Sequence, residues 1–252
     1  MKINKYLLIY NIKLQTGHFM QLFWSVLFPI FMAVIVTKFQ LENVPAAFLD
    51  DVKTKVTISI SLIIPMTIFF INYGINESYI KDRCIDLRMR LFGVSSSADL
   101  AAKVISIYIF LLFSWAAYFF SLYFIVGYQL PTLQGFLVYI LIVSIVGIFY
   151  SFLGQGIVYL TNSVASANAV IMALYFLILL VSGIFGVDVN KFPGWLQDVS
   201  KIFPYSYLAK NDVLDIWYWK GYDYHNLFYS CLAFGALTTV FLLLTKKKAV
   251  RS

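Results

Sequence analysis

The sequence lacks charge over a long central stretch. Residues 104–187, 84 positions in all, contain no aspartate, glutamate, lysine, arginine or histidine. About a quarter of the residues in a soluble domain are charged, so chance would give this run with a probability on the order of 10⁻¹¹. A soluble fold needs a charged shell, whereas a charge at the centre of a membrane-spanning helix costs about 2.5–3.5 kcal/mol. The run excludes a soluble protein and indicates an integral membrane protein.

Segments that alternate between apolar and polar residues are also missing. A transmembrane barrel would contain such segments, each about ten residues long, but Phe136–Ile148 and Val170–Val181 are apolar on all sides. In lipid every backbone polar group must be satisfied internally, so helices are the remaining solution. We therefore expect an all-α membrane protein.

Residues that carry catalysis or bind metals are scarce. The two cysteines, Cys84 and Cys231, fall in a charged loop and in an apolar segment, which argues against a structural disulfide. The two histidines, His18 and His225, lie outside the apolar segments, so we expect no metal site. The P-loop motif G-x-x-x-x-G-K-[ST] does not occur, and no base accompanies the serines and cysteines of the apolar segments. We expect no catalytic residues, no cofactor and no enzyme activity in this chain.

Six apolar segments are long enough to cross a membrane, and we place residues 1–252 in a single transmembrane domain. The expected spans are residues 19–37, 56–75, 104–127, 137–160, 168–187 and 227–244. Pro29 and Pro65 lie inside the first two spans and should kink them. No A-x-A cleavage pattern follows the first apolar run, which is too long for a signal peptide.

The distribution of positive charge predicts the orientation of the spans. An even number of spans places both termini on one side of the membrane. With cytoplasmic termini, twelve lysine and arginine residues lie inside and seven lie outside. Cytoplasmic loops carry an excess of these residues, and Lys246–Lys248 directly after the last span fit that rule. We expect both termini in the cytoplasm.

The first 18 residues have a helical pattern of their own. Apolar residues recur at helical spacing, with lysines among them; the apolar set is Ile3, Tyr6, Leu7, Tyr10 and Leu14. This pattern favours an amphipathic helix in the membrane interface over an ordinary frayed basic end.

The loop at residues 76–103 is patterned as well. Ile80, Cys84, Leu87 and Leu91 form one stripe of a helix over residues 79–92, with Asp86 on a solvated face. Gly93 should end this helix. The sequence Ser96-Ser97-Ala98-Asp99 has the form of a capping box and should start the next one. The helix could rest on lipid headgroups or dock a protein partner, and the pattern favours neither.

The same loop resembles the loop between the second and third spans of the ABC type-2 permease family. There an acidic residue precedes a basic, leucine-rich helix, a Pro or Gly break, and a Lys that opens the next span. The residues that fit these places are Glu77, Arg83, Leu87, Arg88, Leu91, Gly93 and Lys103. The chain departs from the family's acidic-Gly-Thr turn, since it reads Arg83-Cys84-Ile85-Asp86.

Residues 188–226 carry a second resemblance, to the family's helical hairpin between the last two spans. The matching sequence is Phe192-Pro193-Gly194-Trp195, followed by Phe203-Pro204. Pro193-Gly194 is a turn pair and Pro204 should break a helix. We expect an extracellular re-entrant hairpin whose aromatic residues suit the headgroup zone. These residues are Tyr205, Tyr207, Trp217, Tyr218, Trp219, Tyr222 and Tyr224.

The resemblance implies the membrane-spanning permease subunit of an ABC exporter in a bacterial plasma membrane. Its partners would be an ATPase subunit that holds ATP and Mg²⁺, a second permease protomer in a homodimer or heterodimer, and membrane lipids, with no nucleic acid. The cargo would be amphiphilic, such as a drug, a hydrophobic peptide or a lipid-linked molecule.

The resemblance also implies roles for particular residues. The ATPase would dock on Glu77, Ile80, Arg83, Leu87, Arg88 and Leu91. The outer gate would consist of Phe192, Pro193, Gly194, Trp195, Phe203 and Pro204. The sequence does not identify substrate-binding residues.

Two other functions are compatible with the composition. A secondary transporter or channel is disfavoured because the spans offer no charge for ion coupling and the chain contains no internal repeat. An accessory immunity membrane protein that works without an ATPase is the other alternative.

The expected topology can be tested by cysteine labelling. In a background without Cys84 and Cys231, we expect Ser97→Cys to react from the cytoplasm and Gln197→Cys to react from outside. A membrane-impermeant maleimide applied to intact cells should therefore label only Gln197→Cys. Labelling of both variants on intact cells would show that the two loops share one side.

Overall fold

The computed structural model describes residues 5–17, 19–42, 44–185, 189, 192–210 and 212–251, and over these residues it contains helices and no strands. As the sequence predicts, six helical segments are long and apolar enough to cross a membrane. They are Phe19–Leu41, Ala46–Asp82, Ser96–Ile125, Leu133–Leu160, Val164–Val181 and His225–Ala249. The all-α membrane fold is confirmed. The expected end of the fifth span, Val187, lies outside the described residues.

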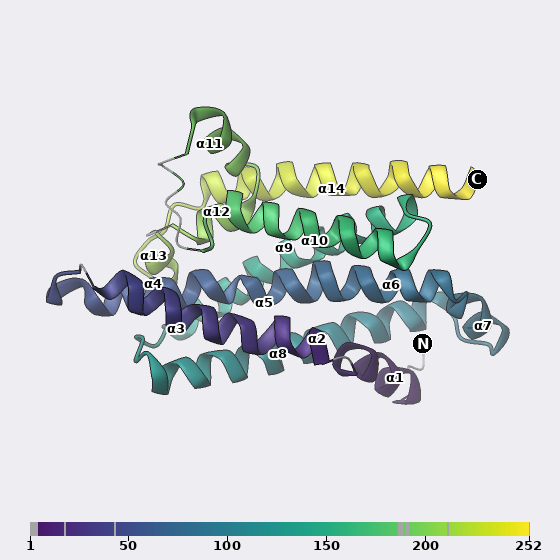
Figure 1. The fold of residues 1–252 in the computed structure, drawn as a ribbon, viewed down its shortest axis with the longest axis horizontal. Coiled ribbons are helices and arrows are strands. Elements are labelled where there is room, and N and C mark those ends of the chain that lie inside the picture. The colour runs from purple at the N-terminus through teal and green to yellow at the C-terminus, as the bar shows by residue number, and fades with distance from the viewer. Residues whose placement is uncertain are drawn as a thin grey trace.

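The long helices lie side by side along one axis of the molecule (Figure 1). The first span comprises α2 (Phe19–Leu22), the π-helix η1 (Phe23–Leu27) and α3 (Phe28–Leu41). The third to sixth spans are α8 (Ser96–Ile125), α9 (Leu133–Leu160), α10 (Val164–Val181) and α14 (His225–Arg251).

Shorter helices mark the two ends of the bundle. The α7 end carries α1 (Lys5–Thr16), α7 (Ile85–Leu91) and the last turns of α14 (Figure 1). Toward the opposite end, called the α13 end, lie α11 (Gly194–Ser200), α12 (Pro204–Leu208) and α13 (Val213–Trp217) (Figure 1). The short 3₁₀ helix η2 (Ala46–Phe48) precedes the second span.

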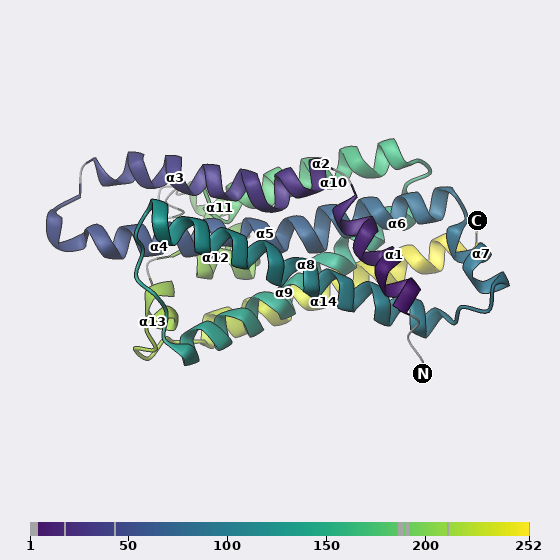
Figure 2. The same ribbon diagram turned by 90° about the horizontal axis from the view of Figure 1, so that it is seen from below.

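The second span is the centre of the bundle. It consists of α4 (Leu49–Ser61), α5 (Ile63–Met66), the π-helix η3 (Thr67–Asn72) and α6 (Tyr73–Asp82). Figure 2 shows it between α3 and α10 on one side and α8, α9 and α14 on the other. In the apolar stretch of the second span 89% of the residues are buried, against 22% in that of the first span. The second span is therefore the core of the fold, and the first lies at its surface.

Irregular turns accompany both prolines of the first two spans. Proline has no N–H, so the Ser61 carbonyl, four residues before Pro65, loses its usual donor. The helix is interrupted there, with α4 ending at Ser61 and α5 beginning at Ile63. Pro29 is the second residue of α3, which directly follows the π-helical turn η1. The two π-helices meet inside the protein, where Asn72 Nδ2 donates a hydrogen bond of 3.1 Å to Ser25 Oγ.

Tyrosines from three surrounding helices pair with polar groups of the second span. Tyr139 of α9 lies 2.6 Å from Ser61 Oγ, and Tyr175 of α10 lies 3.0 Å from Thr67 Oγ1. Tyr118 of α8 donates to the Thr57 carbonyl at 2.8 Å. All three tyrosine side chains are buried. No water is available in the hydrocarbon layer, so these pairings satisfy hydroxyls that would otherwise be costly there.

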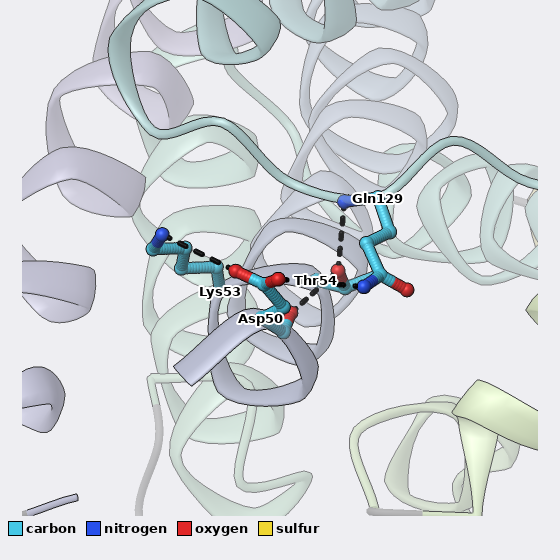
Figure 3. A network of polar contacts seen from close by, with 4 residues as sticks. All are labelled: Asp50, Lys53, Thr54 and Gln129. Carbon is cyan, nitrogen blue, oxygen red and sulfur yellow. Dashed lines mark hydrogen bonds and ion pairs between the residues drawn. The ribbon is translucent and has the colours of Figure 1, made fainter. Parts of the chain in front are cut away.

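At the α13 end, polar contacts join α4 to the connection between α8 and α9 (Figure 3). The backbone N–H of Gln129 donates to Thr54 Oγ1 at 3.0 Å, and Thr54 Oγ1 donates to the Asp50 carbonyl at 2.7 Å. Asp50 also forms an ion pair of 3.4 Å with Lys53.

Trp217 attaches α13 to the same connection. Its Nε1 donates to the Gln129 carbonyl at 3.0 Å, and its own carbonyl accepts from the backbone N–H of Thr132 at 3.1 Å. Both Trp217 and Tyr205 are fully buried. The expectation that these two side chains face the headgroup zone is therefore wrong, because both pack inside the protein.

A close approach at Gly135 predicts a destabilising substitution. A Cβ on Gly135 would lie 2.5 Å from the Trp217 carbonyl oxygen, and backbone cannot move aside as a flexible side chain can. Overpacking of this kind costs about 1–3 kcal/mol, whereas alanine in a helix gains only about 0.5–1 kcal/mol over glycine. We expect Gly135→Ala to lower the midpoint of thermal unfolding in detergent by a few degrees.

Gly194→Ala is the matched control, because nothing lies within 4 Å of the added methyl group. This variant should unfold at the wild-type temperature. A wild-type or higher midpoint for Gly135→Ala would contradict the close packing of α13 on α9.

Candidate functional site at the α7 end

The helix expected over the first 18 residues is present as α1, from Lys5 to Thr16. It packs against α8, and Leu7 lies against Ala98 and Ala102. The side chains that it buries are Leu7, Asn11 and Gln15. Tyr6, which was expected in the apolar stripe, is 70% exposed. Ile3 and His18 lie outside the described residues. Whether α1 lies in the membrane interface stays a prediction.

The single helix expected over residues 79–92 is wrong. Cys84 has a φ of +50°, in the left-handed region, and divides the segment in two. Its backbone N–H still donates to the Lys81 carbonyl at 3.1 Å. Its own carbonyl accepts from the backbone N–H of Arg88 in the next helix at 3.3 Å. The stripe that joined Ile80 to Leu91 is therefore split between α6 and α7.

This break divides the six residues expected to dock a partner. Glu77 and Ile80 belong to α6, and Ile80 is only 2% exposed, so its expected place on a docking face is wrong. Arg83, Leu87, Arg88 and Leu91 are exposed in the turn and on α7. Leu87 is 60% exposed and Leu91 is 86% exposed. Phe92, which the stripe did not include, is equally open at 86%. The exposed apolar surface of α7 consists of Leu87, Leu91 and Phe92.

An ion cluster around Lys103 joins three helices beneath this surface. Lys103 Nζ of α8 lies 2.8 Å from Glu77 Oε1 of α6, 3.1 Å from Asp99 Oδ2 of α8 and 3.9 Å from Asp86 Oδ1 of α7. The Lys103, Glu77 and Asp99 side chains are only 12%, 10% and 14% exposed. Asp86 was expected on a solvated face, yet it faces this ammonium and is half-exposed.

One ammonium faces three carboxylates in this cluster. Burial makes the loss of a partner costly, because the remaining charges stay desolvated. Tyr10 of α1 lies near the same charges: burial raises the pKa of its hydroxyl, and the Lys103 charge opposes that rise. The cluster therefore links the second span, α7 and the third span electrostatically, with α1 beside it.

The start of α8 differs by one residue from the expected capping box. Ser95, not Ser96, is the N-cap, and its Oγ accepts from the backbone N–H of Ala98 at 3.3 Å. Asp99 pairs with Lys103 instead of closing a capping box. Gly93 does end α7, as predicted, with a φ of +78° and a hydrogen bond of 3.0 Å from its N–H to the Arg90 carbonyl.

A second lysine joins α6 to α9. Lys81 Nζ donates to the carbonyl of Val158 at 2.8 Å and to that of Thr161 at 2.9 Å. These carbonyls lie at the end of α9, where helical carbonyls lack backbone donors and the helix dipole favours a positive charge. Lys81 lines two cavities, of about 210 and about 250 Å³.

The residues expected to form an outer gate lie away from α7, where α11 protrudes from the bundle (Figure 1). Pro193 is the N-cap of α11, which begins at Gly194, and Trp195 is exposed on it. Pro204 begins α12, and the ring of Phe203 contacts that of Phe234 on α14. Phe192 accepts a hydrogen bond on its carbonyl from Gln197 Nε2 at 2.8 Å. The role of these residues as a gate stays a prediction.

Comparisons with known proteins point to one family. The model of the ABC-2 type transporter family matches residues 4–211. No curated protein and no solved structure matches the chain. Among the described residues, no group of three or more His, Cys, Asp and Glu side chains could hold a metal ion.

The Lys103 cluster predicts a strong effect of removing its single cation. Lys103→Met would leave the Glu77 and Asp99 carboxylates buried without a counter-charge, a change that costs about 3–5 kcal/mol in other proteins. We expect a clear drop in the thermal unfolding midpoint of the detergent-solubilised chain. Lys103→Arg keeps the charge and should recover part of the loss.

Lys201→Met is the control for this experiment. Lys201 pairs with Asp198 at 2.6 Å, but both side chains are largely exposed. Exposed pairs contribute little, so this variant should unfold like the wild type. Equal midpoints for Lys103→Met and Lys201→Met would contradict a stabilising role for the cluster.

Proposed function

The chain belongs to the ABC-2 type transporter family, and we propose that it is the permease subunit of an ABC exporter driven by a separate ATPase subunit. The match covers most of the chain, and the six apolar helices make it a multi-pass membrane protein. The proposal of a separate ATPase partner rests mainly on one observation. The exposed apolar surface of α7 lies at an end of the bundle that is rich in positive charge.

The charge distribution supports a cytoplasmic α7 end. Lys246–Lys248 lie in the last turns of α14, and Arg83, Arg88 and Arg90 lie around α7, all at the same end of the bundle. Lysine and arginine near the ends of spans favour the cytoplasmic side. This orientation places α7 where an ATPase subunit can reach it.

The properties of α7 support docking of a protein. No residue of α7 is buried in the chain itself, although Leu87 and Leu91 are large and apolar. Exposed apolar patches rimmed by charged residues are typical of interaction surfaces. Arg88 and Arg90 lie between the two leucines in the sequence and supply such charges. The ATPase would cover the exposed apolar surface of α7 and leave these arginines at the rim.

The ion contacts beneath α7 supply a route for motion. Lys103 connects Asp86 of α7 with Glu77 of α6, while Lys81 connects α6 with the end of α9. A movement of α7 on ATP binding would therefore pull on the third span, which runs unbroken as α8 over 30 residues. The second span is interrupted at Leu62 and η3, so it would transmit the movement less rigidly.

Two such protomers would form the path for the substrate, with the residues around α11 and α12 as its outer gate. The spans around the path contain many aromatic and aliphatic residues and no charge over residues 104–187. An amphiphilic substrate fits such a lining, because its apolar part would stay in contact with apolar groups and would not enter water. As an exporter, the complex would move this substrate from the cytoplasm outward, the direction that the family resemblance implies.

Docking on α7 can be tested with Leu87→Asp. Burial of one leucine is worth about 1.5–3 kcal/mol, which is roughly ten- to a hundred-fold in affinity. The new carboxylate would also lose its hydration in the interface. We expect much less ATPase subunit to co-purify with the tagged chain, with normal amounts of the chain in the membrane.

Leu130→Asp provides a matched control. Leu130 is 61% exposed, as Leu87 is at 60%, but lies in the connection between α8 and α9 at the other end. This variant should retain its ATPase subunit. Full retention by Leu87→Asp would mean that α7 rests on lipid and does not dock a protein.

A further inference from the structure

A cavity of about 210 Å³ lies between the end of α6, α7 and the last turns of α9. The polar residues that line it include Glu77, Asp86 and Gln155. Leu87 forms another part of the wall and also belongs to the exposed apolar surface of α7. The cavity therefore adjoins the surface on which we place the ATPase.

Two acceptors at this cavity, Asp86 and Gln155 Oε1, lack a close hydrogen-bond donor among the described residues. Lys81 lines it, but its Nζ donates to two carbonyls at the end of α9. Lys103 faces three carboxylates, and its distance to Asp86, 3.9 Å, is the longest of the three. Gln155 Oε1 is buried and accepts no hydrogen bond within the described residues. A buried acceptor without a donor costs free energy, so a donor from outside would be favourable here.

We propose that this cavity receives a basic side chain of the ATPase subunit, with arginine as the best fit. This inference rests on the proposed function and names the chemistry of the partner's contact. Guanidinium is planar and carries five N–H donors, so it can bond to a carboxylate and to a neighbouring carbonyl oxygen together. Here the carboxylate is that of Asp86, and the second acceptor is Gln155 Oε1, which is buried in this structure and would turn toward the cavity to accept the bond. The positive charge would also offset the excess of carboxylates around Lys103.

The cavity contains a natural attachment point for locating the partner residue. Cys84 is exposed and lines the cavity. In a Cys231→Ala background, a short reagent that reacts with a thiol at one end and arginine at the other should join Cys84 to the ATPase in the purified complex. Peptide mass spectrometry would then identify the arginine. Cross-links from Cys84 only to arginines of this chain would overturn the proposal.

Two substitutions test the contact itself. Gln155→Leu removes the buried acceptor without touching α7 or the Lys103 cluster, and Asp86→Asn removes one carboxylate charge. Hydrogen bonds to charged groups are strong, so each change should weaken ATPase retention roughly ten- to a hundred-fold. Asn162→Leu, in the neighbouring cavity of about 250 Å³, is the control and should change nothing. Thermal unfolding of each variant verifies that it is folded.

Charge exchange provides the decisive comparison. Asp86→Arg should abolish retention of the wild-type ATPase, and replacement of the cross-linked arginine by glutamate should restore it. If Leu87→Asp loses the ATPase while Gln155→Leu and Asp86→Asn keep it fully, the cavity contact is wrong and the proposed function stands. If no ATPase subunit accompanies even the wild-type chain, the proposed function fails and this inference fails with it.

Discussion

The absence of water in the hydrocarbon layer is the constraint on which the rest of this structure depends. The second span carries several hydroxyl and amide side chains, and lipid offers them no partner. Several of them pair with residues of other helices, such as Ser61 with Tyr139, Thr67 with Tyr175 and Asn72 with Ser25. A span with these requirements must be surrounded by protein. Its central position in Figure 2 follows from its polar groups as much as from its apolar ones.

The charged residues of the described spans lie toward the ends of their helices, and several of them connect helices there. Lys103 and Lys81 each reach from one helix to the backbone or carboxylates of others, because a long side chain can carry its charge several ångströms from its own helix. Together they attach the end of the second span to α8, α7 and α9. No residue of α7 is fully buried, so these contacts, the turns at its ends and the packing of half-buried Met89 against Leu7 and Ala98 determine its position. A helix held in this way can be moved by a partner without unpacking the core.

Much of the fold could be predicted because nearly every residue of a membrane span must be uncharged and largely apolar. A charge-free run of 84 residues permits few architectures, and all six spans were found. The end of α7 was predictable too, because Gly93 adopts a positive φ that other residues avoid. The break at Cys84 was not predictable, since a cysteine rarely takes the left-handed conformation and the surrounding residues continue a helical pattern. Periodicity therefore placed Ile80 on the surface, although it packs in the interior.

The sequence by itself determined the class of the protein, the number of its spans and the segment that could bind a partner. The first two depend on the transfer of residue types between water and lipid, which is additive along the chain. The third was indicated by helical periodicity and by the family resemblance. Only the tertiary structure decided which side chains of that segment are free. The contacts of Lys103 with Glu77 and Asp86 join residues from three helices. The cavity likewise brings Asp86 of α7 together with Gln155 of α9, whose Oε1 accepts no hydrogen bond within the described residues. Such distances depend on how the helices pack, and no local pattern in the sequence specifies them.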